Sequence, residues 1–204
     1  MPNQQLTLSI DIRSEWHIST GDEGGAYADA LMLKDQNHLP YIPGRSVRGL
    51  LKEAFKIAQD NQWLVDQPHL VNLLFGEEGE QTSSQGLLRI TNAALSGEEI
   101  AYFKEHKQSG AHKQLYRVHY ATAIDNRTGV AKEGSLRGME VAAPMTLTST
   151  VSLNNHHPNV NEFDNSTLVE LINSITPLIT NVGAKKHRGY GQAFVTVDIR
   201  QGGK

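Results

Sequence analysis

A glycine-rich basic segment near the C-terminus has the residue types that are needed to hold a phosphate backbone. It reads GAKKHRGYG over residues 183–191 and lies between a helical pattern and a strand pattern. Glycines let successive backbone N–H groups turn toward an anion because they adopt positive φ, and the cationic side chains add attraction. A ring of Tyr190 or His187 can stack on a base. The segment therefore predicts either one wall of a single-stranded RNA site or a solvated turn that leads into a strand. The residues expected to contact RNA are Gly183, Lys185, Lys186, His187, Arg188, Gly189, Tyr190 and Gly191.

A second cationic cluster stands where a helix is expected to begin. Residues 40–52 read PYIPGRSVRGLLK, so a turn at Gly44 leads into a helix with Ser46 as its N-cap. Free N–H groups and the helix dipole favour a phosphate at such a helix start. Gly49 costs about 1 kcal/mol inside a helix relative to alanine, which indicates close packing or a close ligand. The alternative interpretation is a capped helix with an ordinary charged face. The candidate RNA contacts, expected to share its exposed side, are Arg45, Ser46, Arg48 and Lys52.

The composition gives no support to a free-standing nucleic-acid binder. The chain of 204 residues fits one domain and has a formal net charge of −3, so an RNA site must come from local clusters of cations. It has no cysteine, which excludes disulfides and thiolate metal sites. The first ten residues lack the pattern of a signal peptide, and the apolar stretches are too short to span a bilayer. We expect a cytoplasmic protein with no membrane partner.

Hydrophobic periodicity predicts the elements that must position these residues. Leucine and isoleucine alternate with polar residues over 6–14, which indicates a half-buried strand. Apolar residues recur at helical spacing over 47–65 and 166–180, so two amphipathic helices are expected, the second with Ser166 as a cap. The other predicted elements are strands at 28–35, 86–95, 139–153 and 192–200, a short helix at 98–106, loops at 18–29 and 77–86, and a hairpin-like excursion within 116–147.

The order of these elements is β, helix, β, long insertion, β, helix, β. A β-α-β-β-α-β order is ferredoxin-like, and helices packed on one face of a mainly antiparallel sheet make an α+β sandwich. The predicted fold class is therefore α+β, with a ferredoxin-like or RRM-like antiparallel sheet, helices on one face and a β-hairpin insertion. This fold serves RNA recognition modules and many unrelated proteins, so function must be argued from the site.

Four segments of the chain resemble a known family in the same order. LPYIPGRSVRGLLKEA at 39–54 and GAKKHRGYGQAFV at 183–195 are similar to the helix opening and the glycine-rich loop of the repeat-associated mysterious proteins, the RAMP superfamily of CRISPR systems. LFGEEG at 74–79, followed by the strand at 86–95, resembles an FG segment of that family. Residues 124–147 are similar to a segment of the repeated backbone subunits of type III effector complexes.

The resemblance implies a guide-RNA-binding backbone subunit of an antiviral CRISPR ribonucleoprotein. Its partners would be guide CRISPR RNA, target RNA, copies of itself and other CRISPR effector subunits. The chain would form one domain over residues 1–204, with core elements at about 4–103 and 139–201 and a thumb-like insertion at about 104–138 that wedges between guide and target. Further RNA contacts are expected from Arg117, Arg127 and Arg137, and from His17 after the first strand.

The resemblance also implies a catalytic residue. In the backbone subunits, target RNA is cut by an aspartate in the loop after the first strand. Asp29 follows Gly24-Gly25 and lies six residues before Asp35, so the role is carried to Asp29. A single carboxylate can hold a divalent cation beside a kinked phosphate, or assist deprotonation of a 2′-hydroxyl. A hard oxygen ligand suits magnesium or manganese, which one aspartate would have to share with the RNA.

Three other functions stay open at the level of the sequence. The first is a backbone subunit that binds RNA without cutting it. The second is a metal-independent, guide-processing endoribonuclease that uses His17 or His187 for acid–base chemistry. The third is an unrelated ferredoxin-like scaffold without affinity for RNA. The segment 116–147 favours the backbone subunits over the endoribonuclease.

Overall fold

A four-stranded antiparallel sheet forms the centre of the computed structural model, which describes residues 5–21, 24–25, 27–65, 67–77, 84–160 and 165–199. The strands lie in the order β4-β7-β1-β8, and each neighbouring pair is antiparallel. With a helix after the first strand and another before the last, this is the ferredoxin-like arrangement. The predicted fold class is therefore confirmed. The strands are β1 (Leu6–Ile12), β4 (Leu88–Ile90), β7 (Met145–Leu153) and β8 (Ala193–Ile199).

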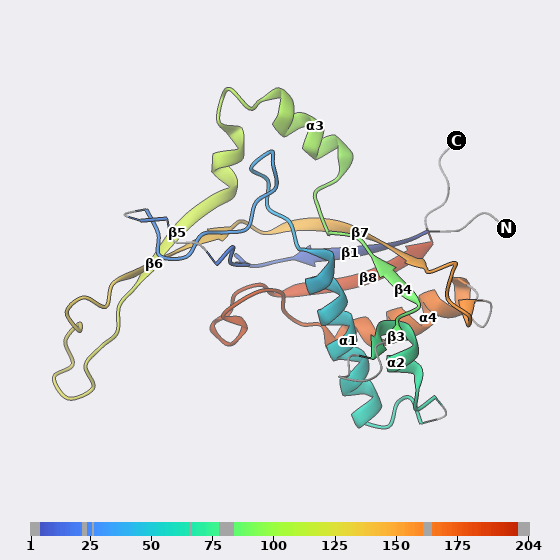
Figure 1. Ribbon diagram of the computed structural model, residues 1–204. Helices are drawn as coiled ribbons and strands as arrows, with labels where there is room; N and C mark the ends of the chain where they lie inside the picture. Colours follow the sequence, from blue (N-terminus) through green and yellow to red (C-terminus); the bar gives the residue numbers. More distant parts are fainter. Residues whose placement is uncertain are drawn as a thin grey trace.

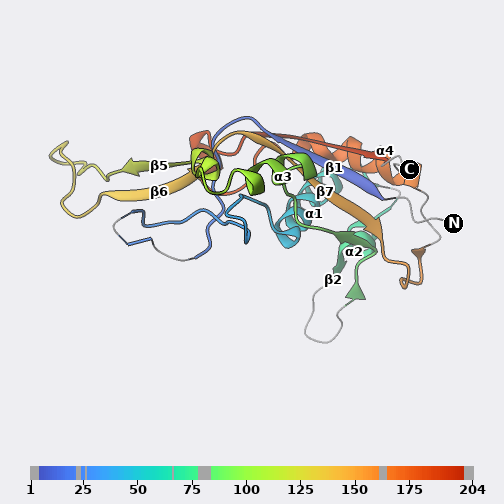
Figure 2. The ribbon, with the colours of Figure 1, turned by 90° about the horizontal axis from the view of Figure 1, so that it is seen from above.

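The core lies between this sheet and two helices. Helix α1 (Gly44–Asp60) and helix α4 (Asn165–Ile175) cover one side of the sheet, whereas α3 (Gly97–Glu105) lies on the other side (Figures 1 and 2). The alternating pattern of β1 turns one set of side chains into this core, and burying each of them contributes about 1.5–3 kcal/mol. Core side chains from the three elements include Leu6, Leu8, Ile10, Ile12, Leu51, Phe55, Leu168 and Ile172.

A β-hairpin projects from one end of the sheet. It consists of β5 (Tyr116–Ala121) and β6 (Arg137–Ala142), which pair with each other in a separate two-stranded sheet (Figure 1). The loop that joins them, residues 122–136, turns at Asp125, whose Oδ1 accepts the N–H groups of Arg127 and Thr128 at 2.8 and 3.0 Å. Both bonds lower the pKa of Asp125, and the bond from Thr128 has the larger effect. We call residues 116–142 the thumb.

Several predicted boundaries are wrong because contacts distant in sequence decide them. Residues 28–35 form isolated bridges instead of a strand, and the predicted strand 139–153 is divided into β6 and β7. The second helix ends at Ile175 and continues as the 3₁₀ turn η3 (Thr176–Leu178). Elements that the sequence did not predict are α2 (Leu70–Phe75), the pair β2 (Gly76–Glu77) and β3 (Ser84–Gln85), and the 3₁₀ turns η1 (Ala111–Leu115) and η4 (Lys186–Arg188).

Part of the predicted loop at 77–86 lies outside the described residues, namely 78–83. Helix α4 begins at Asn165, one residue before the serine that was predicted to cap it. Within the described ranges, none of the helices is long and apolar enough to cross a membrane.

Candidate nucleic-acid interface

The glycine loop, residues 183–191, is an exposed turn held at both ends by the segment that follows β1. The N–H of Ala184 donates to the carbonyl O of His17, and the N–H of Gly191 donates to that of Glu15, each at 2.8 Å. Gly183 and Gly191 have φ of +80° and +67°, and a Cβ on either would collide with a backbone carbonyl oxygen. These two glycines are therefore required by a close approach of two backbones, while the side chains of residues 185–188 between them are exposed.

A groove of about 730 Å³ brings this loop together with the thumb and the predicted catalytic residue. We call it the thumb groove. Three segments far apart in sequence supply its walls: residues 29–30, the thumb and the glycine loop. Four cationic side chains and two carboxylates line it, which concentrates positive charge on a chain of net negative charge. The charged lining residues are Asp29, Lys132, Glu133, Arg137, Lys185 and Arg188.

Asp29 is exposed at the root of the thumb. Its Oδ2 accepts the N–H of Gly138 at 2.6 Å, while its own N–H donates to the carbonyl O of Gly138 at 2.9 Å. This reciprocal pair fixes the carboxylate beside the thumb groove and joins residues 29 and 138 rigidly. Among the described residues, Oδ1 has no protein partner, so one oxygen of the carboxylate is available to a ligand.

His17 is buried beneath the same groove, although we predicted it as an RNA contact. Only 2% of it is exposed, and its Nδ1 lies 2.6 Å from the carbonyl O of Glu140. A carbonyl can only accept, so Nδ1 carries the proton and Nε2 is the acceptor nitrogen. Burial lowers the pKa of His17, with a smaller lowering from the charge of Lys185, which keeps the imidazole neutral at pH 7. His17 therefore holds the thumb against the segment that follows β1.

The start of helix α1 differs from the prediction. The helix begins at Gly44, with Pro43 as its N-cap, so Ser46 lies inside the first turn and caps nothing. The N–H of Gly44 donates to Oδ1 of Asn92 at 2.8 Å, and that of Ser46 to the carbonyl O of Pro43 at 2.8 Å. Two N–H groups that a phosphate would need are already satisfied. Gly44 is required because a Cβ there would collide with the carbonyl O of Ile90.

The three cations of this helix do not share one exposed side. Arg45 is exposed, whereas Arg48 and Lys52 are half-buried. Arg48 donates from Nη2 to the carbonyl O of Phe75, and Lys52 donates from Nζ to that of Gly76 at 3.2 Å. These carbonyls lie at the C-terminal end of α2, where a cation compensates the helix dipole. The geometry gives Arg48 and Lys52 a structural task, and their contact with RNA stays a prediction.

A second cleft, of about 520 Å³, connects α1 to the thumb groove. Gly49 borders it, and no described atom comes within 4 Å of a Cβ built at that glycine. The predicted close packing of Gly49 is therefore wrong, and a close ligand stays a prediction. The two hollows have His17, Ser19 and Ala184 in common, so they lie next to each other. The other lining residues include Ser46, Leu50, Glu53 and Gly183.

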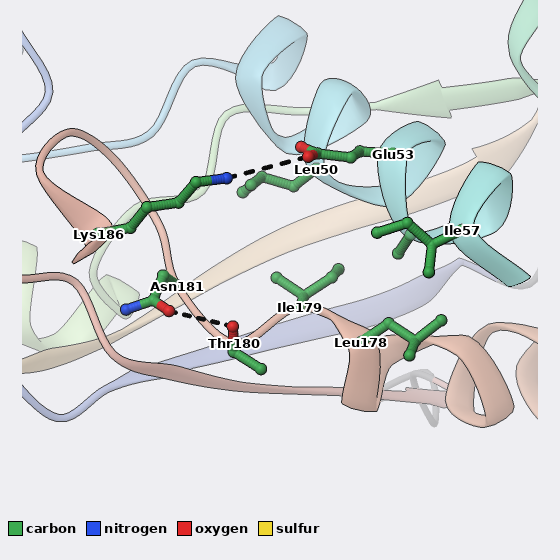
Figure 3. A pocket seen from close by; sticks show the side chains of 9 residues that line it. Leu50, Glu53, Ile57, Leu178, Ile179, Thr180, Asn181 and Lys186 are labelled. Atoms are coloured by element: carbon green, nitrogen blue, oxygen red, sulfur yellow. Dashed lines mark hydrogen bonds and ion pairs between the residues drawn. The ribbon is translucent and has the colours of Figure 1, made fainter.

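Lys186 faces α1 instead of the thumb groove. Its Nζ lies 3.9 Å from Oε1 of Glu53, across a small pocket of about 190 Å³ with mixed apolar and polar lining (Figure 3). Both side chains are about half exposed, so this ion pair contributes little to stability. It does direct one cation of the glycine loop toward the helix.

Tyr190 is held by the base of the thumb. Its hydroxyl lies 3.1 Å from Nδ1 of His119, whose Nε2 is 2.9 Å from Oε2 of Glu15. The other oxygen of Glu15 accepts Nη1 of Arg117 at 3.3 Å. This chain of contacts joins the glycine loop to β5, and it occupies a ring that we expected to stack on a base. Stacking by Tyr190 and contact of RNA with Arg117 stay predictions.

The remaining predicted contacts lie along the thumb and the loop. Arg137 lines the thumb groove, and Arg127 lies at the tip of the thumb. His187 and Gly189 are exposed in the glycine loop. Two charged groove residues, Lys132 and Glu133, were not predicted, although both fall in the segment that was predicted to form the thumb. Gly138 was not predicted either, and its partner, Asp29, lies 109 residues away.

The described residues give a metal ion few ligands. No group of three histidine, aspartate or glutamate side chains within them could hold one. Asp29 offers one carboxylate oxygen, and a hard divalent cation there would need phosphate oxygens and water to complete its shell. Magnesium or manganese shared with RNA fits this donor set, whereas a resident structural metal does not.

The fold and this site together define a class of protein. It is a ferredoxin-like domain whose thumb and glycine loop line one groove. The family model of the RAMP superfamily matches residues 9–195, so the chain belongs to the RAMP superfamily. None of the curated protein sequences matches it.

Two solved structures share the fold. A chain of the cryo-EM structure of the type III-B Cmr-beta bound to cognate target RNA superposes with a TM-score of 0.69 at 10% identity. That alignment covers 96% of this chain and 98% of the other. A chain of the type III-B Cmr-beta in the apo state gives a TM-score of 0.65 at 12% identity, with 95% and 97% covered.

Proposed function

We propose that this chain is a backbone subunit of a type III-like CRISPR ribonucleoprotein, which binds guide RNA and cuts the paired target RNA. The observation that carries the proposal is the thumb groove, in which the glycine loop, the thumb and Asp29 meet. Family membership and the similarity of fold to chains of the Cmr-beta structures support it. The partners would be guide CRISPR RNA, target RNA, copies of this chain and other effector subunits, in the cytoplasm.

The guide backbone would follow a path from the cleft beside α1 to the thumb groove. Ser46 lines the cleft at one end of this path, next in sequence to the exposed Arg45, and Lys185 and Arg188 line the groove at the other end. Lysine and arginine contacts to phosphate read no sequence, so base pairing by the guide would supply the specificity. Because each subunit has only a few of these cations, affinity would come from a row of subunits.

Cleavage would proceed by attack of a 2′-oxygen on the adjacent phosphorus. The P–O bond to the 5′-oxygen breaks, which leaves a 2′,3′-cyclic phosphate and a 5′-hydroxyl once the leaving oxygen takes a proton from water. Asp29 would accept the proton of the 2′-hydroxyl or hold a divalent cation, and its oxygen that is not bonded to Gly138 supports this role. A bound magnesium or manganese ion would neutralise charge on the phosphate.

The decisive variant is Asp29→Asn. An asparagine keeps an oxygen that can accept the N–H of Gly138, so the root of the thumb is preserved while the carboxylate charge is lost. In the assembled complex with magnesium, we expect cutting of target RNA to fall by about 10²-fold or more, with guide and target binding unchanged. Glu98→Gln is the control, because it removes an exposed carboxylate of α3 that does not line the groove, and it should cut normally. Undiminished cutting by Asp29→Asn would show that Asp29 is not catalytic.

A binding-only subunit is the second candidate function. The contact between Asp29 and Gly138 favours it, because a purely structural aspartate at the root of the thumb would make the same bonds. This function predicts that the wild-type complex never cuts target RNA in magnesium or manganese. It also predicts that Asp29→Ala changes only the melting temperature.

A further inference from the structure

A separate pocket lies on the other side of the buried Glu140, between η1, β5 and the segment 27–38. It has a volume of about 540 Å³. It shares no lining residue with the thumb groove, although Glu140 and Tyr27 are close in sequence to the groove residues Met139 and Asp29. The side chains that carry the argument are Lys34, His38, His112, Lys113, Tyr116 and Glu140.

Two imidazoles form one wall of this pocket. The rings of His38 and His112 are stacked, with their centroids 5.5 Å apart and their planes at 26°. His38 has φ of +61°, an unfavourable conformation for a residue with a side chain, and its carbonyl O accepts the hydroxyl of Tyr116 at 2.7 Å. The loop is thus held in a strained conformation that keeps the two rings together.

The second observation is an unsatisfied nitrogen. Nδ1 of His112 is buried without a hydrogen-bond partner, the only such side-chain atom in the part of the chain that the structure describes. A buried polar atom without a partner is costly, and native proteins usually supply a partner. Because this nitrogen is closed to solvent in the unliganded chain, the ring of His112 would have to turn for a ligand in the pocket to supply the missing partner.

The charges identify the kind of ligand. Lys113 is exposed at the pocket, and Lys34 crosses it with Nζ 4.2 Å from the centre of the Tyr116 ring. The carboxylate of Glu140 is already used, because it accepts Lys34 Nζ at 2.7 Å and the N–H of Met32 at 3.0 Å. No carboxylate that lines the pocket is left to bind a cation. Stacked imidazoles beside the exposed ammonium group of Lys113 suit an anion instead.

We propose that the pocket between His38, His112 and Lys113 binds a phosphate group, as an anion site separate from the thumb groove. Nδ1 of His112 would donate to a phosphate oxygen, and Lys113 would add a second charge-assisted contact. The same chemistry is present in a nucleoside monophosphate and in a phosphodiester of RNA. The site does not depend on the proposed function, because free phosphate would occupy it in the isolated chain.

Acid should strengthen this binding. Burial lowers the pKa of His112, and the positive charges of His38, Lys113, Lys107 and Lys34 lower it further, so the ring is neutral at pH 7. An anion in the pocket would stabilise the protonated ring, so affinity for sulfate should rise as the pH falls below about 6.5. Sulfate is the suitable probe because its charge does not change in this range. The other ionisable groups at or near the pocket are Tyr27, Asp35, Tyr116 and Glu140.

The test is a titration of the full, ¹⁵N-labelled chain, followed by the ring-nitrogen resonances of its histidines. Inorganic phosphate and sulfate should shift the signals of His38 and His112, and His112→Ala should weaken phosphate binding at least tenfold. His156→Ala, which removes an exposed imidazole outside the pocket, should have no effect. Displacement of sulfate by adenosine monophosphate, or by a short single-stranded RNA, would identify the source of the phosphate.

Two results would overturn the proposal. The first is that neither phosphate nor sulfate moves the two histidine signals in the wild-type chain, a measurement that needs no variant to fold. The second is that zinc alone shifts both rings while the anions do not, which would make the pair of imidazoles a metal site. Failure of either kind leaves the RNA path untouched, because that path involves other residues. Conversely, a complex that never cuts target RNA would say nothing against this pocket.

Discussion

At the scale of single residues, the buried His17 makes the stability of the protein depend on pH. Its imidazole is neutral in the fold, because burial lowers its pKa below the unfolded value of about 6.5. The unfolded chain therefore binds one more proton in this range. The contribution of His17 is full above pH 6.5 and is lost as the pH falls from there toward the folded pKa.

His17→Asn tests this dependence. The asparagine amide can still donate to the carbonyl O of Glu140, but it does not titrate. Urea unfolding at a series of pH values should show that the wild-type chain loses more free energy of unfolding below pH 6.5 than the variant does. Parallel pH curves for the two proteins would mean that His17 takes up its proton without disturbing the fold.

Arg48 and Arg45 are both cations of helix α1, but replacing them with alanine should have different effects on stability and on RNA binding. Arg48→Ala removes a charge-assisted bond to the carbonyl O of Phe75, so we expect the free energy of unfolding to fall by about 1–2 kcal/mol. The affinity for RNA and its dependence on salt should not change. Arg45→Ala removes an exposed cation, so stability should stay within about 0.5 kcal/mol. If it contacts phosphate, its plot of log affinity against log salt should become shallower by about 0.7.

Denaturant unfolding measures the free energy of unfolding of Arg48→Ala and Arg45→Ala. Fluorescence anisotropy with labelled RNA measures the affinity of each variant for RNA at a series of salt concentrations. If Arg48→Ala flattens the salt plot as much as Arg45→Ala does, Arg48 contacts the guide and its bond to α2 is secondary.

At the scale of elements, the glycine loop contains two kinds of glycine: those that a close backbone contact requires and those with open space around them. Gly191 is buried with positive φ, and an alanine there would collide with the carbonyl O of Val182. Gly189 also has positive φ, but no described atom lies within 4 Å of the added Cβ. Gly189→Ala should therefore cost only the backbone strain, about 1–2 kcal/mol. Gly191→Ala should cost more, because the loop must leave the 15–17 segment, and RNA affinity should fall with it.

Thermal unfolding of the two glycine variants, together with their RNA affinity, measures this difference. Equal destabilisation by the two alanines would contradict the close approach of backbones at Gly191.

How far sequence predicts these elements depends on how local the determining contacts are. The alternation of apolar and polar residues over 6–14 is a local signal, and it correctly predicted a strand, β1, with one buried face. The glycines at 183 and 191 were recognised, but their close contact with the 15–17 segment and with Val182 was not predicted, and their contact with RNA stays a prediction. No local signal identifies the partners of His17 or Arg48, which lie 123 and 27 residues away. The site residues were therefore predicted by type and by family, while their tasks needed the fold.

At the scale of the whole molecule, the loop of the thumb, residues 122–136, is separable from the core. None of the residues 122–136 is buried, and none belongs to the core cluster. Three of them are exposed apolar side chains: Ile124, Val130 and Leu136 are 55%, 62% and 65% exposed. Exposed apolar side chains that support no core can serve as contacts for a partner. We infer that the loop 122–136 contributes nothing to folding and, if the proposed function holds, serves the assembled complex.

A shortened thumb tests this division. Ala121 and Arg137 face each other at the end of the hairpin, so Asn-Gly in place of 122–136 closes it with a two-residue turn. The melting temperature should stay the same, because no core contact is lost. The thumb groove, however, loses Lys132, Glu133 and the rest of that wall, so cutting of target RNA should fall while guide binding weakens only slightly. The control replaces residues 122–136 with a glycine-serine loop of the same length, which keeps the length of the thumb but removes its side chains.

If the shortened chain melts at a lower temperature, the loop does support the fold. If both variants cut at the wild-type rate, the thumb wall of the groove has no part in the reaction.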